Sequence, residues 1–281
     1  MTPPLVLKFG GELLEDASRM AAVVAAVRDI SGAAGGTPPV PLVIVHGGGK
    51  EIDAALKTAG IDKRQVDGLR ITDEATLDIV VAVLAGAINT RFVAALGAAG
   101  VQAVGLTGAD GGCGLSELAP PHLTIDGQTV YLGRVGHPAE LADMHLLNGL
   151  LRDGFVPVVA SIGVDRDGGL LNINADTMAG HLAASLAARR LVIAGSTPGV
   201  LDDNGATVAV LDPAAIARLF SGRTATAGMI AKLRACTHAI GHGVDEVVIV
   251  DGRDRDALSA AASGAIPASA TRVAATVGIR S

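Results

Sequence analysis

The chain has 281 residues, 49% of them hydrophobic, and a formal net charge of −6. This length allows one large α/β domain or two lobes around a cleft, with ample apolar material for a core. The negative charge and the 2% aromatic content argue against nucleic acid as a partner, because such binding relies on basic patches and stacking platforms, so a small-molecule ligand is expected.

The sequence shows no sign of export, a membrane span or a disulfide framework. Its longest uncharged apolar run, residues 79–88, is too short to cross a bilayer and predicts a buried helix. The opening residues lack a basic region followed by a long apolar run, so no secretory signal is expected. Cys113 and Cys236 match no zinc or disulfide spacing and are expected to be packing thiols. We therefore expect a cytoplasmic protein without a tightly bound metal.

Two strand–glycine–helix units open the chain. An apolar strand at residues 5–7 ends at Lys8 and is followed by two glycines and a helical pattern over 16–30. A second strand, residues 42–46, leads to three consecutive glycines and another helix. Two such units in succession imply a parallel sheet with both glycine turns at the carboxyl ends of their strands, which is the edge where ligands bind.

The rest of the chain continues as alternating strands and helices. Towards the middle, the patterns predict a helix capped by Thr72 that runs to about residue 99, a buried strand at 103–106, a hairpin over 122–132 that turns at Asp126-Gly127, a helix from Pro138 to about 151, and a buried strand at 156–160. Beyond it, they predict a turn at 165–169, a helix from Asn174 to about Arg189, a strand at 191–194, helices starting at Pro213 and spanning 228–241, and strands at 246–250 and 272–277. No linker divides the chain cleanly, so one domain with two lobes is expected.

The glycine run Gly47-Gly48-Gly49 favours an anion as its guest. Glycine lets the backbone approach a ligand closely, and the N–H groups at the start of the following helix attract phosphate or carboxylate. The run is neither a P-loop, because Lys50 is followed by Glu51, nor a dinucleotide fingerprint, because Ile52 stands where the third glycine belongs. A turn of purely structural use is the alternative interpretation.

Three further features are candidates for chemistry. Lys8 closes an apolar strand at the ligand edge, where it is either a solvated strand-end lysine or a positive charge aimed at phosphoryl oxygens. The segment Asn172–Asp176 either caps a helix through Asn174 or points polar side chains into a cleft. Lys232 lies about one turn into a helix, where a solvated lysine is the usual case.

These segments together resemble the acetylglutamate kinase branch of the amino-acid-kinase family. The resemblance rests on KFGGELL, VIVHGGGKEID, DGLRITDEATLDIVVAVLAGAIN, NINAD, PGVLDD and AGMIAKL, which occur in this order over nearly the whole chain. It implies an α/β fold, an open αβα sandwich around a mainly parallel central sheet. It also implies an N-terminal lobe, residues 1–165, for the amino-acid substrate and for homodimerisation, and a C-terminal lobe, residues 166–281, for ATP.

The resemblance also implies roles for individual residues. Lys8 and Lys232 would stabilise the transferring phosphoryl group, Asp176 would orient both lysines, and Gly11 and Gly48 would offer backbone N–H groups to it. The implied contacts of N-acetyl-L-glutamate are Gly48, Gly49, Arg70 and Asn172, with Arg70 taking the α-carboxylate by a bidentate pair. The implied nucleotide-binding residues are Gly195, Ser196, Thr197, Gly199, Leu201, Thr224 and Thr226.

The chemistry of phosphoryl transfer agrees with such a set. It needs alignment and charge neutralisation, which lysines and backbone N–H groups supply. A γ-carboxylate nucleophile has a reference pKa of about 4.3 and needs no general base at neutral pH. No histidine is therefore required, and His238 and His242, which lack a third ligand, are expected to be packing or surface residues. Mg²⁺ is expected to arrive with ATP, held mainly by phosphates and water.

The chain departs from the family pattern in three places. In the ATP-binding part of the sequence, Gly195-Ser196 stands where the family usually has a residue pair that contains an aspartate. Lys8 lies so near the start that the N-terminal helix of arginine-inhibited hexameric relatives is missing, which favours a dimer without arginine feedback. The ending SATRVAATVGIRS is also unusual. Two other functions stay open, a kinase for another N-blocked acidic amino acid such as an acetylated or carrier-linked aminoadipate, and a catalytically weak ligand-binding regulator.

Overall fold

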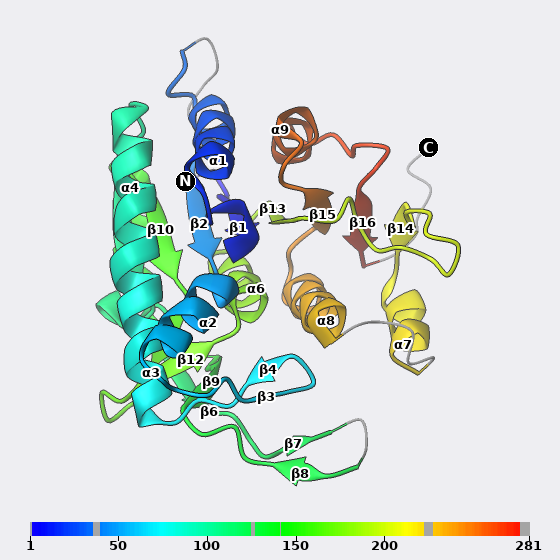
Figure 1. Ribbon diagram of the computed structural model, residues 1–281. Helices are drawn as coiled ribbons and strands as arrows, with labels where there is room; N and C mark the ends of the chain where they lie inside the picture. The colour runs from blue at the N-terminus through cyan, green and yellow to red at the C-terminus, as the bar shows by residue number, and fades with distance from the viewer. Residues whose placement is uncertain (1, 36–39, 125–126, 141, 222–226, 276–281) are drawn as a thin grey trace.

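The structure is a computed structural model that describes residues 2–35, 40–124, 127–140, 142–221 and 227–275. Its centre is an eight-stranded sheet in the order β14-β16-β15-β13-β1-β2-β10-β5 (Figure 1). Its strands are β1 (Leu5–Phe9), β2 (Leu42–His46), β5 (Ala103–Thr107), β10 (Val156–Ala160), β13 (Arg190–Gly195), β14 (Val210–Leu211), β15 (Glu246–Asp251) and β16 (Thr271–Ala274). From β5 to β15 all neighbouring strands are parallel, and β16 runs antiparallel to β15.

Helices cover both faces of this sheet because its strands are apolar on both sides. On β1, Leu5 and Leu7 belong to one hydrophobic core and Val6 to the other, as the two-residue period of a strand requires. The first core is covered by α1 (Ala17–Ile30), α4 (Asn89–Ala98) and α9 (Arg255–Ser263), and the second by α5 (His145–Arg152), α6 (Ala175–Ser185), α7 (Pro213–Ser221) and α8 (Ala227–Gly241) (Figure 1). The predicted αβα sandwich around a mainly parallel sheet is confirmed.

Smaller sheets lie beside the carboxyl ends of the central strands. One has four strands in the order β11-β12-β9-β6, namely β11 (Ile162–Val164), β12 (Leu170–Ile173), β9 (Val135–Pro138) and β6 (Ser116–Leu118). Two hairpins accompany it, β3 (Gln65–Val66) with β4 (Leu69–Arg70) and β7 (His122–Leu123) with β8 (Thr129–Val130). The second hairpin was predicted, although Asp126 of its turn lies outside the described residues.

Three predicted helix boundaries are wrong. Pro138 ends β9 instead of starting a helix, and α5 begins only at His145. The helix after Asn174 ends at Ser185, because Arg190 already starts the buried strand β13. The helix after the β3–β4 hairpin is capped by Asp73, whose carboxylate accepts from the Thr76 N–H at 2.9 Å, and not by Thr72.

The helical segment from Glu74 to Ala98 is less buried than the sequence suggested. It consists of α3 (Glu74–Val81), a π-helical stretch (Ala82–Ile88) and α4. Among the described residues it is the one helix long and apolar enough to cross a bilayer, by length and composition alone, and 33% of its most apolar window is buried. The strand β5, predicted to be buried, lies at the edge of the sheet, with Gly105 exposed.

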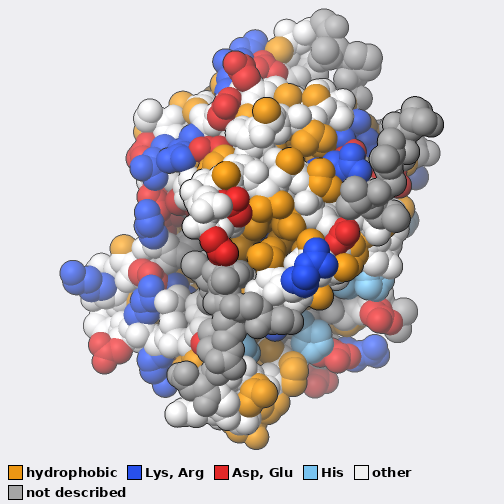
Figure 2. Space-filling view, turned by 90° about the vertical axis from the view of Figure 1, so that its right-hand side faces the viewer, with side chains coloured by type: hydrophobic (Ala, Val, Ile, Leu, Met, Phe, Trp, Pro, Cys, Tyr) orange, Lys and Arg blue, Asp and Glu red, His pale blue; other side chains and the backbone are white. Residues whose placement is uncertain are grey.

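The surface carries charges of both signs. On the face nearest β14 and α7, acidic and basic side chains alternate around a more hydrophobic centre (Figure 2). Such interspersed charge agrees with the modest net charge of −6.

Candidate active site

A single carboxylate joins two lysines that are distant in the sequence. Lys8 comes from β1, Asp176 from the first turn of α6, and Lys232 from α8. The Oδ1 atom of Asp176 lies 2.9 Å from Lys8 Nζ and 3.5 Å from Lys232 Nζ. Lys8 and Asp176 are each 7% exposed, so this cluster is buried and not a solvated lysine at a strand end. The structure therefore brings the two lysines and the aspartate together, and their catalytic roles stay predictions.

Burial and the neighbouring charges change the pKa values of Asp176 and Lys232 in this cluster. Burial alone would raise the pKa of Asp176, but the charges and hydrogen bonds of Lys8 and Lys232 outweigh it and hold the pKa below its usual value. Burial and the nearby charge of Lys8 lower the pKa of Lys232. With all three groups ionised, the cluster carries one net positive charge, which suits an anionic ligand.

Asn174 holds the beginning of α6 in place. Its side-chain Oδ1 accepts from the Asp176 N–H at 2.9 Å and from the Thr177 N–H at 3.1 Å, so it is the helix cap. The capping interpretation of this segment is confirmed. Because the cap fixes the backbone of Asp176, it also fixes the direction from which the carboxylate reaches the two lysines.

The two glycine turns contact each other at the ends of β1 and β2. These strands are paired in register from Leu5–Leu42 to Phe9–His46, so the turns that follow them are neighbours. A Cβ atom added to Gly11 would lie 2.5 Å from the Cα atom of Gly48, and one added to Gly48 would lie 2.2 Å from Cδ1 of Ile88. A side chain at Gly11 would meet the backbone of Gly48, whereas one at Gly48 would have to displace the end of the Ile88 side chain.

A cavity of about 250 Å³ lies between these turns, the small sheet and the β3–β4 hairpin. Six of the predicted site residues line it: Lys8, Gly11, Gly48, Gly49, Arg70 and Asn172. Asn174, the predicted helix cap, also lines it, and Gln65 and Ser161 add polar groups that the sequence did not indicate. The lining of the cavity is mainly polar and includes Lys8 and the glycines of both turns.

Arg70 is, with Lys8, one of the buried cations that line the cavity. It is 9% exposed, and its Nη2 pairs with the carboxylate of Asp53 and donates to the carbonyl oxygen of Gly49 at 3.3 Å. Its Nη1 is buried and has no hydrogen-bond partner among the described residues. A guanidinium group with one unused edge suits a carboxylate ligand, because a buried donor without an acceptor is costly.

Asp53 and Thr72 are site residues that sequence reasoning missed. Asp53 lies on α2 (Gly49–Thr58), one turn after Gly49, and that spacing was its only signal. Thr72 is fully buried, and its Oγ1 accepts from Asn172 Nδ2 at 3.1 Å. These two residues orient Arg70 and Asn172 from behind the cavity.

His46, at the end of β2, supports the glycine turn without entering the cavity. The Nδ2 atom of Asn89 donates to its Nε2 at 3.1 Å and to the carbonyl oxygen of Val158 at 2.9 Å. Burial lowers the pKa of His46 to about 4, against a smaller opposing effect of its hydrogen bond to Gly47. The imidazole is therefore neutral at pH 7 and acts as a structural link between β2, α4 and β10.

The comparisons with known proteins identify the family. Residues 3–251 match the profile of the Amino acid kinase family. The chain belongs to this family. The acetylglutamate kinase of Novosphingobium aromaticivorans is 41% identical over 263 residues, which cover 88% of this chain and 83% of that protein. The acetylglutamate kinase of Sphingopyxis alaskensis is 44% identical over 216 residues, which cover 75% of this chain and 71% of that protein.

Solved structures show the same amino acid kinase fold. The Streptococcus mutans protein smu.665 has a TM-score of 0.79 and 25% identity, covering 98% of this chain and all of that one. The N-acetylglutamate synthase of Neisseria gonorrhoeae has a TM-score of 0.79 and 24% identity, covering 98% of this chain and 60% of that one. An isopentenyl phosphate kinase follows with a TM-score of 0.63 and 20% identity, covering 96% of this chain and 99% of that one. These three likenesses concern the fold.

The predicted nucleotide residues from Gly195 to Leu201 lie at the carboxyl end of β13. Gly195 ends that strand, next to β1, and the Ser196 carbonyl oxygen accepts from Arg253 Nη2 at 2.8 Å. A Cβ atom on Gly199 would lie 2.4 Å from Thr271 Oγ1, so this glycine is required by close packing. Thr197 and Leu201 are exposed. Thr224 and Thr226 lie outside the described residues, and the nucleotide roles of all these residues stay predictions.

The histidines and cysteines of this amino acid kinase have simpler environments. Cys113 and Cys236 are buried free thiols, as predicted. His238 and His242 stack on α8 with ring centroids 4.2 Å apart. In the part of the chain that the structure describes, no group of three or more His, Cys, Asp or Glu side chains is arranged to hold a metal ion. Delivery of Mg²⁺ by ATP stays a prediction.

Proposed function

We propose that this chain uses ATP to phosphorylate the γ-carboxylate of N-acetyl-L-glutamate, the second step of arginine biosynthesis. Curated acetylglutamate kinases about 40% identical over most of the chain support this function. The observation that carries it is the position of the Lys8–Asp176–Lys232 cluster beside a cavity that also holds Arg70. A phosphoryl group and an amino-acid carboxylate thereby each have a cationic partner.

In the proposed mechanism, Arg70 binds the α-carboxylate of the substrate and Asn172 helps to position it. The γ-carboxylate, already ionised, then faces the N–H groups of Gly11 and Gly48 and attacks the γ-phosphorus of ATP in line. Lys8 and Lys232 neutralise the charge that spreads over the equatorial oxygens. Asp176 keeps both ammonium groups at this place, and no residue has to remove a proton.

The nucleotide belongs, in this proposal, to the C-terminal lobe. The segment from Gly195 to Leu201 follows β13 directly, and β13 pairs with β1, so a triphosphate there would point toward Lys8. Residues 1–165 would form the substrate lobe and 166–281 the ATP lobe. Mg²⁺ would accompany ATP as its complex, held by phosphate oxygens and water.

The proposal includes a cytoplasmic homodimer that is formed by the N-terminal lobes. The segment Glu74–Ala98 is its best-placed surface, because it is apolar and only partly buried. Ala82, Gly86 and Ala87 are exposed along it, and small residues let a second helix approach closely. A partner subunit would cover this face and reduce the apolar area in contact with water.

A hydroxylamine trap tests the reaction. The protein is incubated with MgATP and either N-acetyl-L-glutamate, an acetylated aminoadipate or a carrier-linked aminoadipate, and acyl phosphate is captured as hydroxamate. We expect ADP and hydroxamate in equal amounts with N-acetyl-L-glutamate. Product only with an aminoadipate derivative would show that this acid, and not N-acetyl-L-glutamate, is the substrate. The absence of product with every acid would favour a ligand-binding regulator.

Arg70→Gln separates substrate binding from chemistry in the same assay. Loss of the guanidinium group should raise the KM for N-acetyl-L-glutamate about a hundredfold while leaving the KM for ATP unchanged, because a charge-assisted pair to a carboxylate is lost. Arg64→Gln is the matched control, since Arg64 is exposed and its ion pair in the described part of the chain is with Asp73. An unchanged KM in Arg70→Gln would remove Arg70 from the substrate site.

A further inference from the structure

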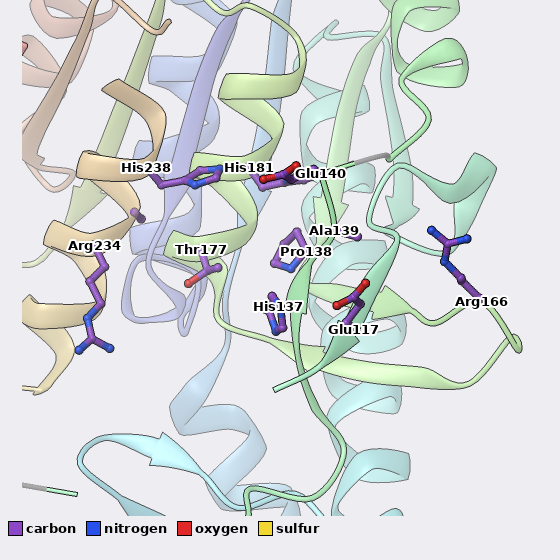
Figure 3. Close-up of a pocket in the computed structure, with 11 residues that line it drawn as sticks. Glu117, His137, Pro138, Ala139, Glu140, Arg166, Thr177, His181, Arg234 and His238 are labelled. Carbon is purple, nitrogen blue, oxygen red and sulfur yellow. The ribbon is translucent and has the colours of Figure 1, made fainter. Parts of the chain in front are cut away.

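Glutamates without an ion pair line two cavities in the described part of the chain. The larger cavity, of about 670 Å³, lies beside α6 and α8, next to His181, and its glutamates are Glu117 and Glu140 (Figure 3). Both are exposed, so water solvates their charges. The cavity of about 250 Å³ that Lys8 lines contains Glu12, which is only partly exposed. Glu12 is therefore the glutamate whose lack of a partner needs a physical explanation.

The Glu12 carboxylate forms neither an ion pair nor a hydrogen bond with any described residue. Only the backbone carbonyl oxygen of Glu12 accepts a hydrogen bond, from Arg19 Nη1 at 2.9 Å. The glutamates that do pair with a basic side chain are Glu15, Glu51, Glu74 and Glu246. A carboxylate that is partly removed from water and unpaired is costly, and a cationic ligand beside it would lower that cost.

Two glycines leave room for the Glu12 carboxylate at the edge of the central sheet. Glu12 lies in the short helical turn Gly11–Leu13, directly after β1. A Cβ atom added to Gly10 would lie 2.3 Å from both carboxylate oxygens, and one added to Gly195 would lie 3.4 Å from Oε1. The carboxylate is therefore beside the carboxyl ends of β1 and β13, which are neighbouring parallel strands. This is the place where the proposed nucleotide segment begins.

The charge of Glu12 offsets the positive charge of the lysine cluster. Lys8 and Lys232 are balanced by the carboxylates of Asp176 and Glu12 when all four groups are ionised. Burial and the charge of Lys8 lower the pKa of Lys232, and the negative charge of Glu12 is among the opposing effects, so the two groups are close enough to interact. A triphosphate without a metal ion would therefore meet a carboxylate and no surplus of positive charge, and would be repelled by Glu12.

We propose that the Glu12 carboxylate coordinates the Mg²⁺ that accompanies ATP. This assignment rests on the proposed function, because it needs a nucleotide at the end of β13. Mg²⁺ prefers oxygen ligands and in kinases is held by one or two carboxylates together with phosphate oxygens and water. The Asp176 carboxylate is less suited, because two ammonium groups already neutralise it. Among the described residues no group of three or more metal-binding side chains could hold the ion by itself, so Glu12 would bind it only together with the nucleotide.

The alternative role for Glu12 is a second counter-charge for Lys232. If that were its only role, removal of its charge would make the site more positive and would strengthen nucleotide binding both with and without the metal ion. Coordination predicts changes of opposite sign. Without the carboxylate, the Mg²⁺ complex loses a ligand and should bind more weakly, whereas the metal-free nucleotide is no longer repelled and should bind more tightly.

Nucleotide binding measures this difference without any reaction. AMP-PNP, an ATP analogue that is not hydrolysed, is titrated into the full chain by isothermal titration calorimetry, once with excess Mg²⁺ and once with EDTA. In Glu12→Gln, the Kd of the Mg²⁺ complex should rise about tenfold while the Kd of metal-free AMP-PNP falls. Glu117→Gln removes the charge of an exposed glutamate outside this cavity and should change neither Kd.

A second variant separates the charge of Glu12 from its place in the fold. Glu12→Asp keeps a carboxylate, so metal-free AMP-PNP should bind it as weakly as it binds the unaltered chain. Binding of metal-free AMP-PNP that is strengthened equally in Glu12→Asp and Glu12→Gln would overturn the proposal, because the charge would then not be the cause.

The remaining outcomes distinguish this assignment from the proposed reaction. Unchanged Kd values in Glu12→Gln, or tighter binding of both forms of the nucleotide, would overturn the role of Glu12 and leave the kinase reaction intact. If the hydroxylamine assay fails while Mg²⁺-dependent binding still requires Glu12, only the acceptor reaction is wrong. No binding of AMP-PNP to the unaltered chain, with or without Mg²⁺, would overturn the role of Glu12 together with ATP as the phosphoryl donor.

Discussion

At the scale of single residues, the site depends on Asp176. A charge buried on β1 without a counter-charge would be costly, because it is removed from water. One carboxylate between Lys8 and Lys232 supplies that counter-charge to both and leaves the cluster a net positive charge for a ligand. The sequence indicated each of these residues, but only the packing of β1, α6 and α8 shows that they share one oxygen atom.

Replacing either lysine should abolish most of the turnover. Lys8→Ala and Lys232→Ala should each lower kcat about a hundredfold to a thousandfold, through lost stabilisation of the transferring phosphoryl group. Steady-state kinetics with MgATP and N-acetyl-L-glutamate measures this. Lys50→Ala is the control, because Lys50 adjoins the glycine turn but is 73% exposed at its side chain and pairs with Glu15. Near-normal kcat in a lysine variant would remove that residue from the mechanism.

The buried histidines make the fold sensitive to acid. The pKa of His46 is about 4 in the folded protein and near 6.5 when the chain is unfolded, so the unfolded chain binds more protons between these values. The free energy of unfolding should therefore fall as pH decreases from about 6.5 to about 4, by up to about 1.4 kcal/mol per pH unit for each such histidine. His181 contributes in the same window, because its pKa is also lowered to about 4.

Urea unfolding at a series of pH values measures this slope. His46→Gln retains groups that can bond to Asn89 and Gly47 but does not titrate, so its slope between pH 6.5 and 4 should be smaller than that of the unaltered chain. Equal slopes in His46→Gln and the unaltered chain would show that His46 is not held neutral by the fold.

At the scale of elements, the two glycine turns are the unit on which the cavity is built. Alternation of apolar strands and helices predicted both turns at one edge of a parallel sheet, since parallel strands end at the same side. The contact between Gly11 and Gly48 was not predictable, because it depends on the register of β1 and β2. The prediction that a helix begins at Pro138 was wrong for a related reason, since Pro138 pairs with Ser116 in the small sheet.

Gly11→Ala should damage both stability and activity. Its Cβ atom would meet the backbone of Gly48 at 2.5 Å, and neither turn can move without disturbing β1 or β2. We expect a loss of about 1–3 kcal/mol in the free energy of unfolding, together with a lower kcat. Gly97→Ala on α4 is the control, because its Cβ atom would meet nothing within 4 Å, and it should be neutral or stabilising. Wild-type stability in Gly11→Ala would show that the turns can separate.

At the scale of the whole molecule, the central sheet brings two halves of the chain to one cleft. β1 lies between β2 and β13, so the glycine turns of the first half meet the end of β13 from the second half. The small sheet then closes the substrate cavity with Asn172 from β12. This placement supports a reaction between two ligands that approach from different lobes.

The proposed dimer is tested on the exposed helical face. Gly86→Arg places a long charged side chain on the surface of the π-helical stretch and should convert a dimer into a monomer, as measured by light scattering coupled to size-exclusion chromatography. Ala214→Arg, on the exposed side of α7, should leave the mass unchanged. A monomer in the unaltered chain, or a dimer in Gly86→Arg, would contradict assembly through this helix.

The sequence by itself determined the layered architecture, the two glycine turns and most of the polar residues around them. Hydrophobic periodicity and glycine positions act locally, so they can be read along the chain. Only the tertiary structure decided the distances within the Asp176 cluster, the pairing of Arg70 with Asp53, and the large cavity beside His181. These features join residues that are far apart in the sequence, and strand register and helix packing decide which of them meet.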